Sequence, residues 1–169
     1  MLVTGMKDVD ARDEELRELV TEIRAARSKP KKLKALLDKY ESEFGPEAEE
    51  RVLGIIAENT RELWAEIAEE REKEGEDNGI QGILDTLWKS FERVGGEFTV
   101  EQTEDSAQIH CTKCPMADTY HKIGKPEYGL IFHCSTDPHI VAGFNPEMEF
   151  KITKKLMMDD CCDHYYRLK

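Results

Sequence analysis

The sequence has little positive charge and no long hydrophobic run. Among its 169 residues, 24 are Lys or Arg and 36 are Asp or Glu, which gives a formal net charge of -12. Clustered Lys and Arg bind phosphate backbones and anionic lipid head groups, so we expect neither nucleic acid nor membrane as a partner. The first 16 residues hold no signal-peptide core, and no apolar stretch approaches a membrane span. We therefore expect a cytoplasmic protein.

Cysteine and histidine are missing from the first 109 residues. All five cysteines and all five histidines lie between residues 110 and 164. An odd cysteine count in a cytoplasmic protein fits a disulfide framework poorly, so the thiols are interpreted as buried groups, metal ligands or reactive groups. This segregation indicates that the second half carries the chemistry and that the first half supports it.

The two halves also differ in their hydrophobic periodicity. Apolar residues at helical spacing predict helices over residues 16–23, 33–44, 52–74 and 80–91. After Gly96, short strand patterns follow over residues 97–103, 106–112, 129–134, 149–156 and 162–168. The prediction is an α+β fold, in which an N-terminal helical half packs on a C-terminal, mostly antiparallel β-sheet with short inserted helices.

The chain length suits one well-cored domain, or a domain with a helical appendage. Residues 1–44 are interpreted as an N-terminal helical extension, and residues 45–169 as the α+β domain that carries the cysteines and histidines. The apolar stripe within residues 16–23 is narrow and could pack against another subunit. The extension is therefore a candidate dimerisation element, and a homodimer is a candidate assembly.

Two cysteines stand just before predicted helix starts. Cys114 precedes Pro115, which suits the first helical position, while Cys134 precedes Asp137 and Pro138, which could cap and start another helix. Free N–H groups and the dipole at a helix start favour thiolate over thiol. Each thiol is thus a candidate nucleophile or metal ligand, although a cysteine ending a strand can equally be a small apolar residue.

A metal site is the alternative use of the cysteines. The Cys-x-x-Cys pair Cys111 and Cys114, joined by Cys134 and Cys162, could hold zinc or an iron–sulfur cluster. A second closely spaced pair is missing, because Cys162 and its neighbour Cys161 would point to opposite faces of a strand. A thioredoxin-type redox pair is disfavoured, since the motif lies in no βαβ pattern.

Strand alternation also sorts the histidines. His110 and His133 each precede a cysteine on a predicted strand, so they should face away from a site that the cysteines share. The expected site histidines are then His121, His139 and His164.

Several segments resemble the L-2-amino-thiazoline-4-carboxylic acid hydrolase-like family: "CTKCP", "FHCSTD", "FNPEMEF" and "TKKLMMDDCCDHYYRL". The resemblance covers residues 45 to 169. In that family the closing segment usually has a glycine where Met158 stands, whereas the pattern is kept at Asp159, Cys162, Asp163, His164 and Arg167. The resemblance implies a hydrolase that opens a thiazoline ring to give an N-carbamoyl cysteine. A more distant similarity to vinyl-reductase-type domains implies a protein that binds a small molecule or a metal between helices and a sheet.

Opening a cyclic amidine adds water at the carbon between sulfur and nitrogen, and needs a nucleophile, a proton shuttle and charge stabilisation. Cys134 is the first candidate nucleophile, followed by Cys114 and Cys162. His164 is the candidate base, although it could also be a structural histidine between tyrosines. The expected function is a hydrolase-like enzyme acting on a small thiazoline or cyclic amidine.

Four further assignments complete the expected site. Asp137 or Asp159 could orient the base or bind a substrate amine, while Cys114 and Arg167 are candidate substrate-binding groups, with Arg167 suited to a carboxylate. The alternative function is a non-catalytic protein that binds metal or a small ligand through the four cysteines at positions 111, 114, 134 and 162.

Overall fold

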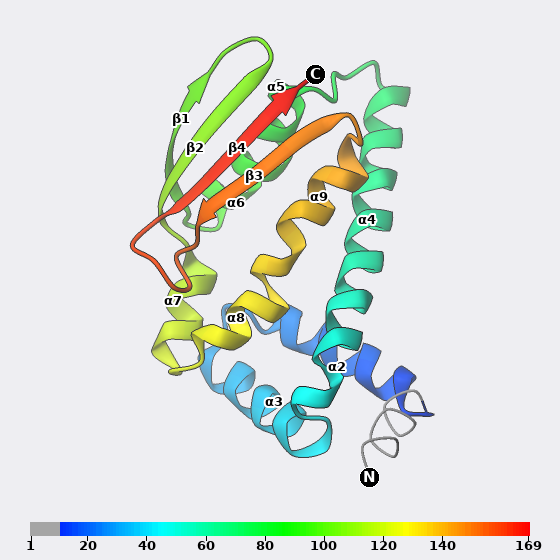
Figure 1. Cartoon of the computed structure of the whole chain (residues 1–169), viewed down its shortest axis with the longest axis vertical. Coiled ribbons are helices and arrows are strands. Elements are labelled where there is room, and N and C mark those ends of the chain that lie inside the picture. Colours follow the sequence, from blue (N-terminus) through cyan, green and yellow to red (C-terminus); the bar gives the residue numbers. More distant parts are fainter. Residues whose placement is uncertain (1–10) are drawn as a thin grey trace.

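The computed structural model describes residues 11–169 (Figure 1). The first half is helical, as predicted, and its elements are α2 (Asp13–Ala25), α3 (Pro30–Glu43), the short turn η1 (Pro46–Ala48), α4 (Glu49–Lys73), and one bent helix made of α5 (Ile80–Ile83), the π-helical η2 (Leu84–Trp88) and α6 (Lys89–Arg93). The second half holds β1 (Glu97–Gln102), β2 (Ser106–Lys113), α7 (Pro115–Lys122), α8 (Pro126–Phe132), η3 (Cys134–Thr136), α9 (Asp137–Phe144), β3 (Met148–Lys154) and β4 (Cys162–Leu168). The predicted α+β fold is confirmed.

The strands described in residues 11–169 form one antiparallel sheet in the order β1-β2-β4-β3. The register pairs Cys111 with Cys162 and His110 with Asp163 across β2 and β4. Because side chains alternate along a strand, Cys162 and His164 share one face of the sheet and Asp163 lies on the other. The bent helix covers the inner face, where Trp88 Nε1 donates a hydrogen bond to the Tyr166 hydroxyl at 3.1 Å.

The segment 129–134 corrects one prediction, since it is not a strand. Residues 126–132 form α8, and Cys134 begins η3. Pro126 fixes a helical backbone angle at the start of α8, and Gly129 lets the helix approach Met157, whose Sδ would lie 2.3 Å from an added Cβ. A short apolar run is compatible with either a buried strand or a buried helix, so its pattern could not decide between them.

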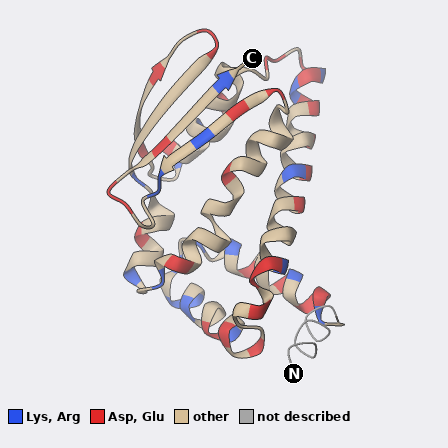
Figure 2. Cartoon of the chain, in the orientation of Figure 1, with Lys and Arg blue, Asp and Glu red and all other residues tan. Residues whose placement is uncertain are grey.

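Two hydrophobic clusters share the interior. One joins α2, α3 and the start of α4 to α7 and α8, and the other lies between the sheet, the bent helix, α4 and α9. Phe91 and Leu156 pack against both clusters. Figure 2 shows Lys, Arg, Asp and Glu along the helices of the first half, in the loops and at points on the strands, while α9 carries one acidic residue, Asp137. The junction of the two clusters is where the candidate site lies.

The N-terminal helices pack into the rest of the chain. The apolar stripe of α2 is at most 2% exposed, and its cluster includes Tyr120 of α7 and Phe132 of α8. The apolar stripe that was suggested as a dimer surface is therefore covered within the protein itself. A homodimer stays a prediction, and it would have to form through another surface. The domain boundary at residue 44 also stays a prediction, and the first ten residues of the predicted extension lie outside the described part. From residue 11 onward, no helix is both long and apolar enough to cross a membrane.

Candidate active site

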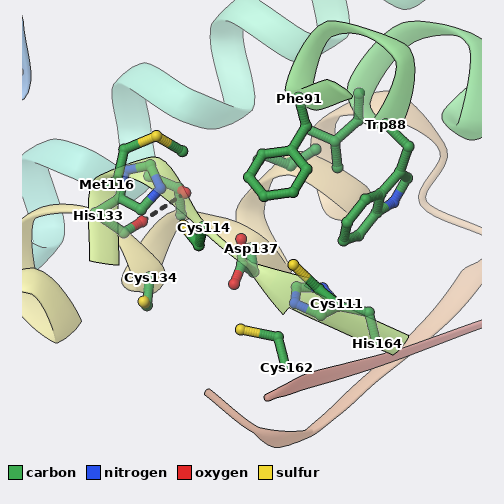
Figure 3. Close-up of a pocket in the computed structure, with 13 residues that line it drawn as sticks. Trp88, Phe91, Cys111, Cys114, Met116, His133, Cys134, Asp137, Cys162 and His164 are labelled. Carbon is green, nitrogen blue, oxygen red and sulfur yellow. Dashed lines mark hydrogen bonds between the residues drawn. The ribbon is translucent and has the colours of Figure 1, made fainter. Parts of the chain in front are cut away.

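A pocket of about 130 Å³ lies between the inner face of the sheet, the bent helix and the starts of α7 and α9 (Figure 3). One wall is apolar and is made by Leu87, Trp88, Phe91, Met116 and Ile140. The polar lining consists of Cys111, Cys114, Cys134, Cys162, His133, His164, Thr136 and Asp137. Four of the five cysteines thus meet here, although they come from β2, the start of α7, η3 and β4.

Cys162 has hydrogen-bond donors on several sides. Its Sγ accepts a hydrogen bond from the backbone N–H of Leu156 at 3.0 Å. A hydrogen bond from Cys111 and another from His164 lower the pKa of Cys162 to about 5, although burial opposes this shift. The same contact and burial raise the pKa of Cys111, whose thiol can also reach the carbonyl of Lys113 at 3.3 Å. Negative charge in this pair therefore belongs on Cys162.

Cys114 and Cys134 behave differently from the prediction. Cys114 does precede Pro115 at the start of α7, yet burial raises its pKa to about 11, even though the N–H groups of Ala117 and Met116 favour the thiolate. Burial and the charge of Asp137 raise the pKa of Cys134 as well. The expectation of thiolates at these helix starts is wrong, because burial of each sulfur outweighs the helix terminus.

His164 lies deep in the pocket, against aromatic rings. Its ring centroid is 5.1 Å from that of Trp88 and 5.5 Å from that of Phe150. Its Nδ1 is buried and has no hydrogen-bond partner within residues 11–169. A buried ring nitrogen without a partner is costly, so the hydrogen-bonding capacity of this atom is unmet.

Asp137 is the one carboxyl group that lines the pocket in the described chain, and its side chain faces Cys162 and His164 (Figure 3). It is the first residue of α9, where it was expected to be the cap; Thr136 holds the cap position. Burial raises the pKa of Asp137 to about 6, while the nearby charge of His164 lowers it. The carboxyl is therefore ionised above about pH 6, but at a cost that a cationic partner would offset.

Several predicted site residues lie elsewhere. Asp159 is exposed and accepts the N–H of Lys155 at 2.9 Å within the turn before β4, and Arg167 is exposed on the other face of that strand. His121 pairs with the carbonyl of Leu156 at 2.8 Å, while His139 Nδ1 accepts a hydrogen bond from Arg61 Nε at 3.0 Å. Neither histidine lines the pocket.

His133 differs from the prediction, which expected this side chain to face away from the shared site. It lines the pocket because the segment that holds it is helical rather than extended, and burial lowers its pKa to about 3. His110 faces away, as alternation predicted. The pocket residues that the prediction missed also include Trp88, Phe91 and Thr136, for which the sequence offers no local signal beyond an amphipathic helix and a capping position.

The four pocket cysteines do not form a tight ligand group. In the part of the chain described here, the one group of three or more ligand atoms within 4.8 Å of one another is His110, Cys161 and Asp163, outside the pocket. A zinc or iron–sulfur site at the four cysteines therefore stays a prediction.

Fold and pocket together define an α+β protein with a cysteine-, histidine- and aspartate-lined cavity between its sheet and its helices. The chain belongs to the L-2-amino-thiazoline-4-carboxylic acid hydrolase family, whose profile matches residues 25–166. No match was found among curated proteins. The chain is also similar to a crystal structure of subunit 3 of a trafficking protein particle complex from Naegleria fowleri, covalently bound to palmitic acid. That similarity has 13% sequence identity, covers 93% of this chain and 96% of that chain, and has a TM-score of 0.45.

Proposed function

We propose that the protein hydrolyses a small thiazoline or related cyclic amidine in this pocket, with Cys162 as nucleophile and His164 as proton shuttle. One observation carries the proposal: Cys162 Sγ accepts the Leu156 N–H at 3.0 Å and shares the cavity with His164. Membership of the family supports a hydrolase-like activity. Cys162 is preferred to Cys134 because Cys162 Sγ has a backbone donor, whereas Cys134 Sγ has none among the described hydrogen bonds.

The reaction has two steps at the amidine carbon. Cys162 sulfur attacks this carbon, the ring carbon–sulfur bond breaks, and the ring sulfur keeps the electron pair and takes a proton from His164. Water then adds to the same carbon and gives one proton to His164, and the bond to Cys162 breaks with its electron pair returning to that sulfur. The net change is addition of one water, which yields a carbamoyl group and a free thiol.

Asp137 suits the charge of such a substrate. An amidine is basic, and its protonated form can pair with the buried carboxylate of Asp137, which offsets the cost of ionising that group. No Lys or Arg side chain lines the pocket in residues 11–169, and Arg167 lies outside it. A substrate carboxylate is therefore expected to remain at the pocket mouth, and the amidine end to enter.

Turnover can be measured with two probes, 2-amino-thiazoline-4-carboxylate and 2-amino-thiazoline without the carboxylate. Wild-type protein should release a free thiol and a carbamoyl product from at least one of them, as detected by a thiol reagent and by mass spectrometry. Cys162→Ser and His164→Asn should each lower kcat by at least about 100-fold, the scale of a lost nucleophile or acid–base group.

Matched controls exist for two of the roles. Asp137→Asn should raise KM, because the carboxylate of Asp137 faces the pocket. Asp159→Asn should keep full activity, because the carboxylate of Asp159 lies outside it. His139→Asn is the corresponding control for His164→Asn. Turnover that survives Cys162→Ser, or a lack of turnover of both probes by wild-type protein, would contradict the proposal.

The alternative is a protein that binds a small ligand without converting it. The apolar wall formed by Trp88, Phe91 and Ile140 favours this second function, because it can hold a ring by contact alone. Saturable binding of either probe by wild-type protein, unchanged in Cys162→Ser and without product, would support it over hydrolysis. A cytoplasmic location stays a prediction for both functions.

A further inference from the structure

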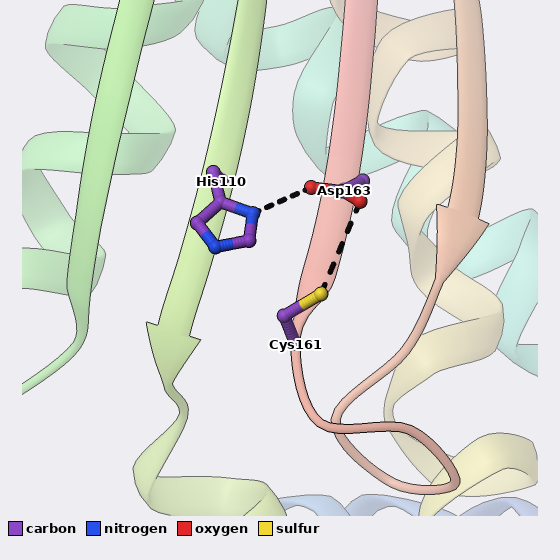
Figure 4. A group of neighbouring side chains, drawn as sticks. All are labelled: His110, Cys161 and Asp163. Carbon is purple, nitrogen blue, oxygen red and sulfur yellow. Dashed lines mark hydrogen bonds and ion pairs between the residues drawn. The ribbon is translucent and has the colours of Figure 1, made fainter.

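Three potential metal ligands meet on the outer face of the sheet, where β4 begins (Figure 4). His110 of β2 lies directly opposite Asp163 of β4 in the register of the two strands. Cys161 is two residues before Asp163 along the chain, so its side chain reaches the same face. These residues come from a different side of the sheet than Cys162 and His164, which line the pocket.

The distances between their ligand atoms are close to those of a metal site. His110 Nδ1 lies 2.8 Å from Asp163 Oδ1, and Cys161 Sγ lies 3.9 Å from Asp163 Oδ2. The imidazole, thiol and carboxylate atoms all lie within 4.8 Å of one another. Ligand atoms around tetrahedral zinc are about 3.3 to 3.6 Å apart, as the usual zinc–nitrogen and zinc–sulfur bond lengths require. Shifts of less than about 1 Å in these side chains would therefore admit an ion.

The three side chains differ in their exposure, and one further acidic residue adjoins Cys161 in the chain. The exposed carboxylate of Asp160 pairs with Lys154 Nζ at 3.8 Å. Cys161 is only 5% exposed, whereas about half of the His110 side chain is open to solvent. The group thus has a shielded soft ligand on one side and an entry path on the other.

We propose that His110, Cys161 and Asp163 bind one divalent zinc ion, with water as the fourth ligand. Nitrogen, sulfur and carboxylate oxygen are the ligand set that zinc accepts, while magnesium and calcium prefer oxygen alone. Cys161 and Asp163 alternate along the chain with Cys162 and His164. A bound ion would therefore fix the start of β4, the strand that presents Cys162 and His164 to the pocket.

Metal binding can be tested on the reduced, metal-free full chain. Zinc is titrated in competition with a chromophoric chelator, and cobalt is used as a spectroscopic substitute whose absorption reports a thiolate ligand in tetrahedral geometry. The expected result is one ion per chain and a thiolate–cobalt band. His110→Ala, Cys161→Ser and Asp163→Asn should each weaken zinc binding by more than about tenfold, since even loss of an outer partner has that effect.

Two controls make the result specific. Cys134→Ser should bind zinc as wild-type protein does, because Cys134 lies in the pocket, and so should His139→Ala. Circular dichroism of each variant separates lost ligands from lost folding, and the exposed His110 is the site where substitution is best tolerated. The proposal is overturned if wild-type protein binds no stoichiometric zinc, or if binding survives both His110→Ala and Cys161→Ser but is lost in Cys134→Ser, as the four-cysteine site requires.

Discussion

Asp137 and His133 lie in the same pocket, and burial shifts their pKa values in opposite directions. Burial raises the pKa of Asp137 to about 6 and lowers that of His133 to about 3, where Arg24 and Arg27 add to the shift. Both shifts favour the neutral form of the side chain, as expected where water is excluded. At neutral pH, however, Asp137 is ionised, so the protein holds an incompletely compensated charge where a substrate cation would bind.

The ionised carboxylate of Asp137 should lower the stability of the folded protein at neutral pH. The folded-state pKa of Asp137, about 6, lies above the ordinary value of 3.8, so the folded protein holds its proton more tightly than the unfolded chain. The stability contributed by this tighter proton binding at Asp137 is complete below about pH 3.8 and is lost as the pH rises through 6. Asp137→Asn should therefore be more stable than wild-type protein at pH 7.5, by about 1 to 3 kcal/mol.

Urea unfolding at pH 4 and pH 7.5 tests this sign, since the advantage of the variant should disappear at the lower pH. Asp159→Asn is the control, because its carboxylate is exposed and should produce no such gain. An equal difference between Asp137→Asn and wild-type protein at both pH values would show that the charge of Asp137 is not the cause.

Among the elements, α9 is the one that carries Asp137 to the pocket, and its close packing on α4 sets its position. Gly143 makes this approach possible: a Cβ there would lie 2.5 Å from the carbonyl oxygen of Arg61 and 3.1 Å from Trp64. Backbone cannot move aside as a flexible side chain can. The packing of Phe144 on Trp64, with ring centroids 6.0 Å apart, holds the same junction.

Gly143→Ala should therefore destabilise the protein by about 1 to 3 kcal/mol, the usual effect of overpacking. Gly54→Ala is a matched control, because it is also helical but its added Cβ meets only Arg51 Nη1, at 3.9 Å. That control should be neutral or stabilising by up to about 1 kcal/mol, from helix propensity. Equal unfolding midpoints for the two variants in urea would contradict the role given to the α4–α9 contact.

Elements with a long, regular pattern could be predicted from the sequence, and so could the grouping of Cys111, Cys114, Cys134 and Cys162. The strand predicted at 129–134 was wrong because a short, mostly apolar segment fits either a buried strand or a buried helix, and this error alone placed His133 on the wrong side. Arg167 is different: it alternates with Cys162 and His164 along one strand, so the pattern already indicated that it faces away. The pKa values could not be predicted, because burial of each sulfur depends on residues far apart in the chain.

At the scale of the whole molecule, the helices of residues 11–44 complete the core beneath the pocket. Leu16, Leu33 and Tyr40 are no more than 1% exposed, and their cluster contains Cys114 and Phe132 from the second half. Arg24 also donates a hydrogen bond to the carbonyl of Phe132 at 2.5 Å, just before the turn that holds Cys134. The supporting role predicted for the first half is thus a direct packing role.

A chain shortened to residues 45–169 should consequently fail to fold cooperatively. Loss of α2 and α3 would uncover the apolar faces of α7 and α8. Each large side chain left exposed forfeits about 1.5 to 3 kcal/mol of burial energy. The total stability of a typical domain is only about 5 to 15 kcal/mol. The shortened chain should bind a hydrophobic dye and show no sharp urea transition, whereas the full chain should show one. A sharp transition for residues 45–169 alone would instead support a domain boundary at residue 44, and would mean that the pocket keeps its thiols in place without α2 and α3.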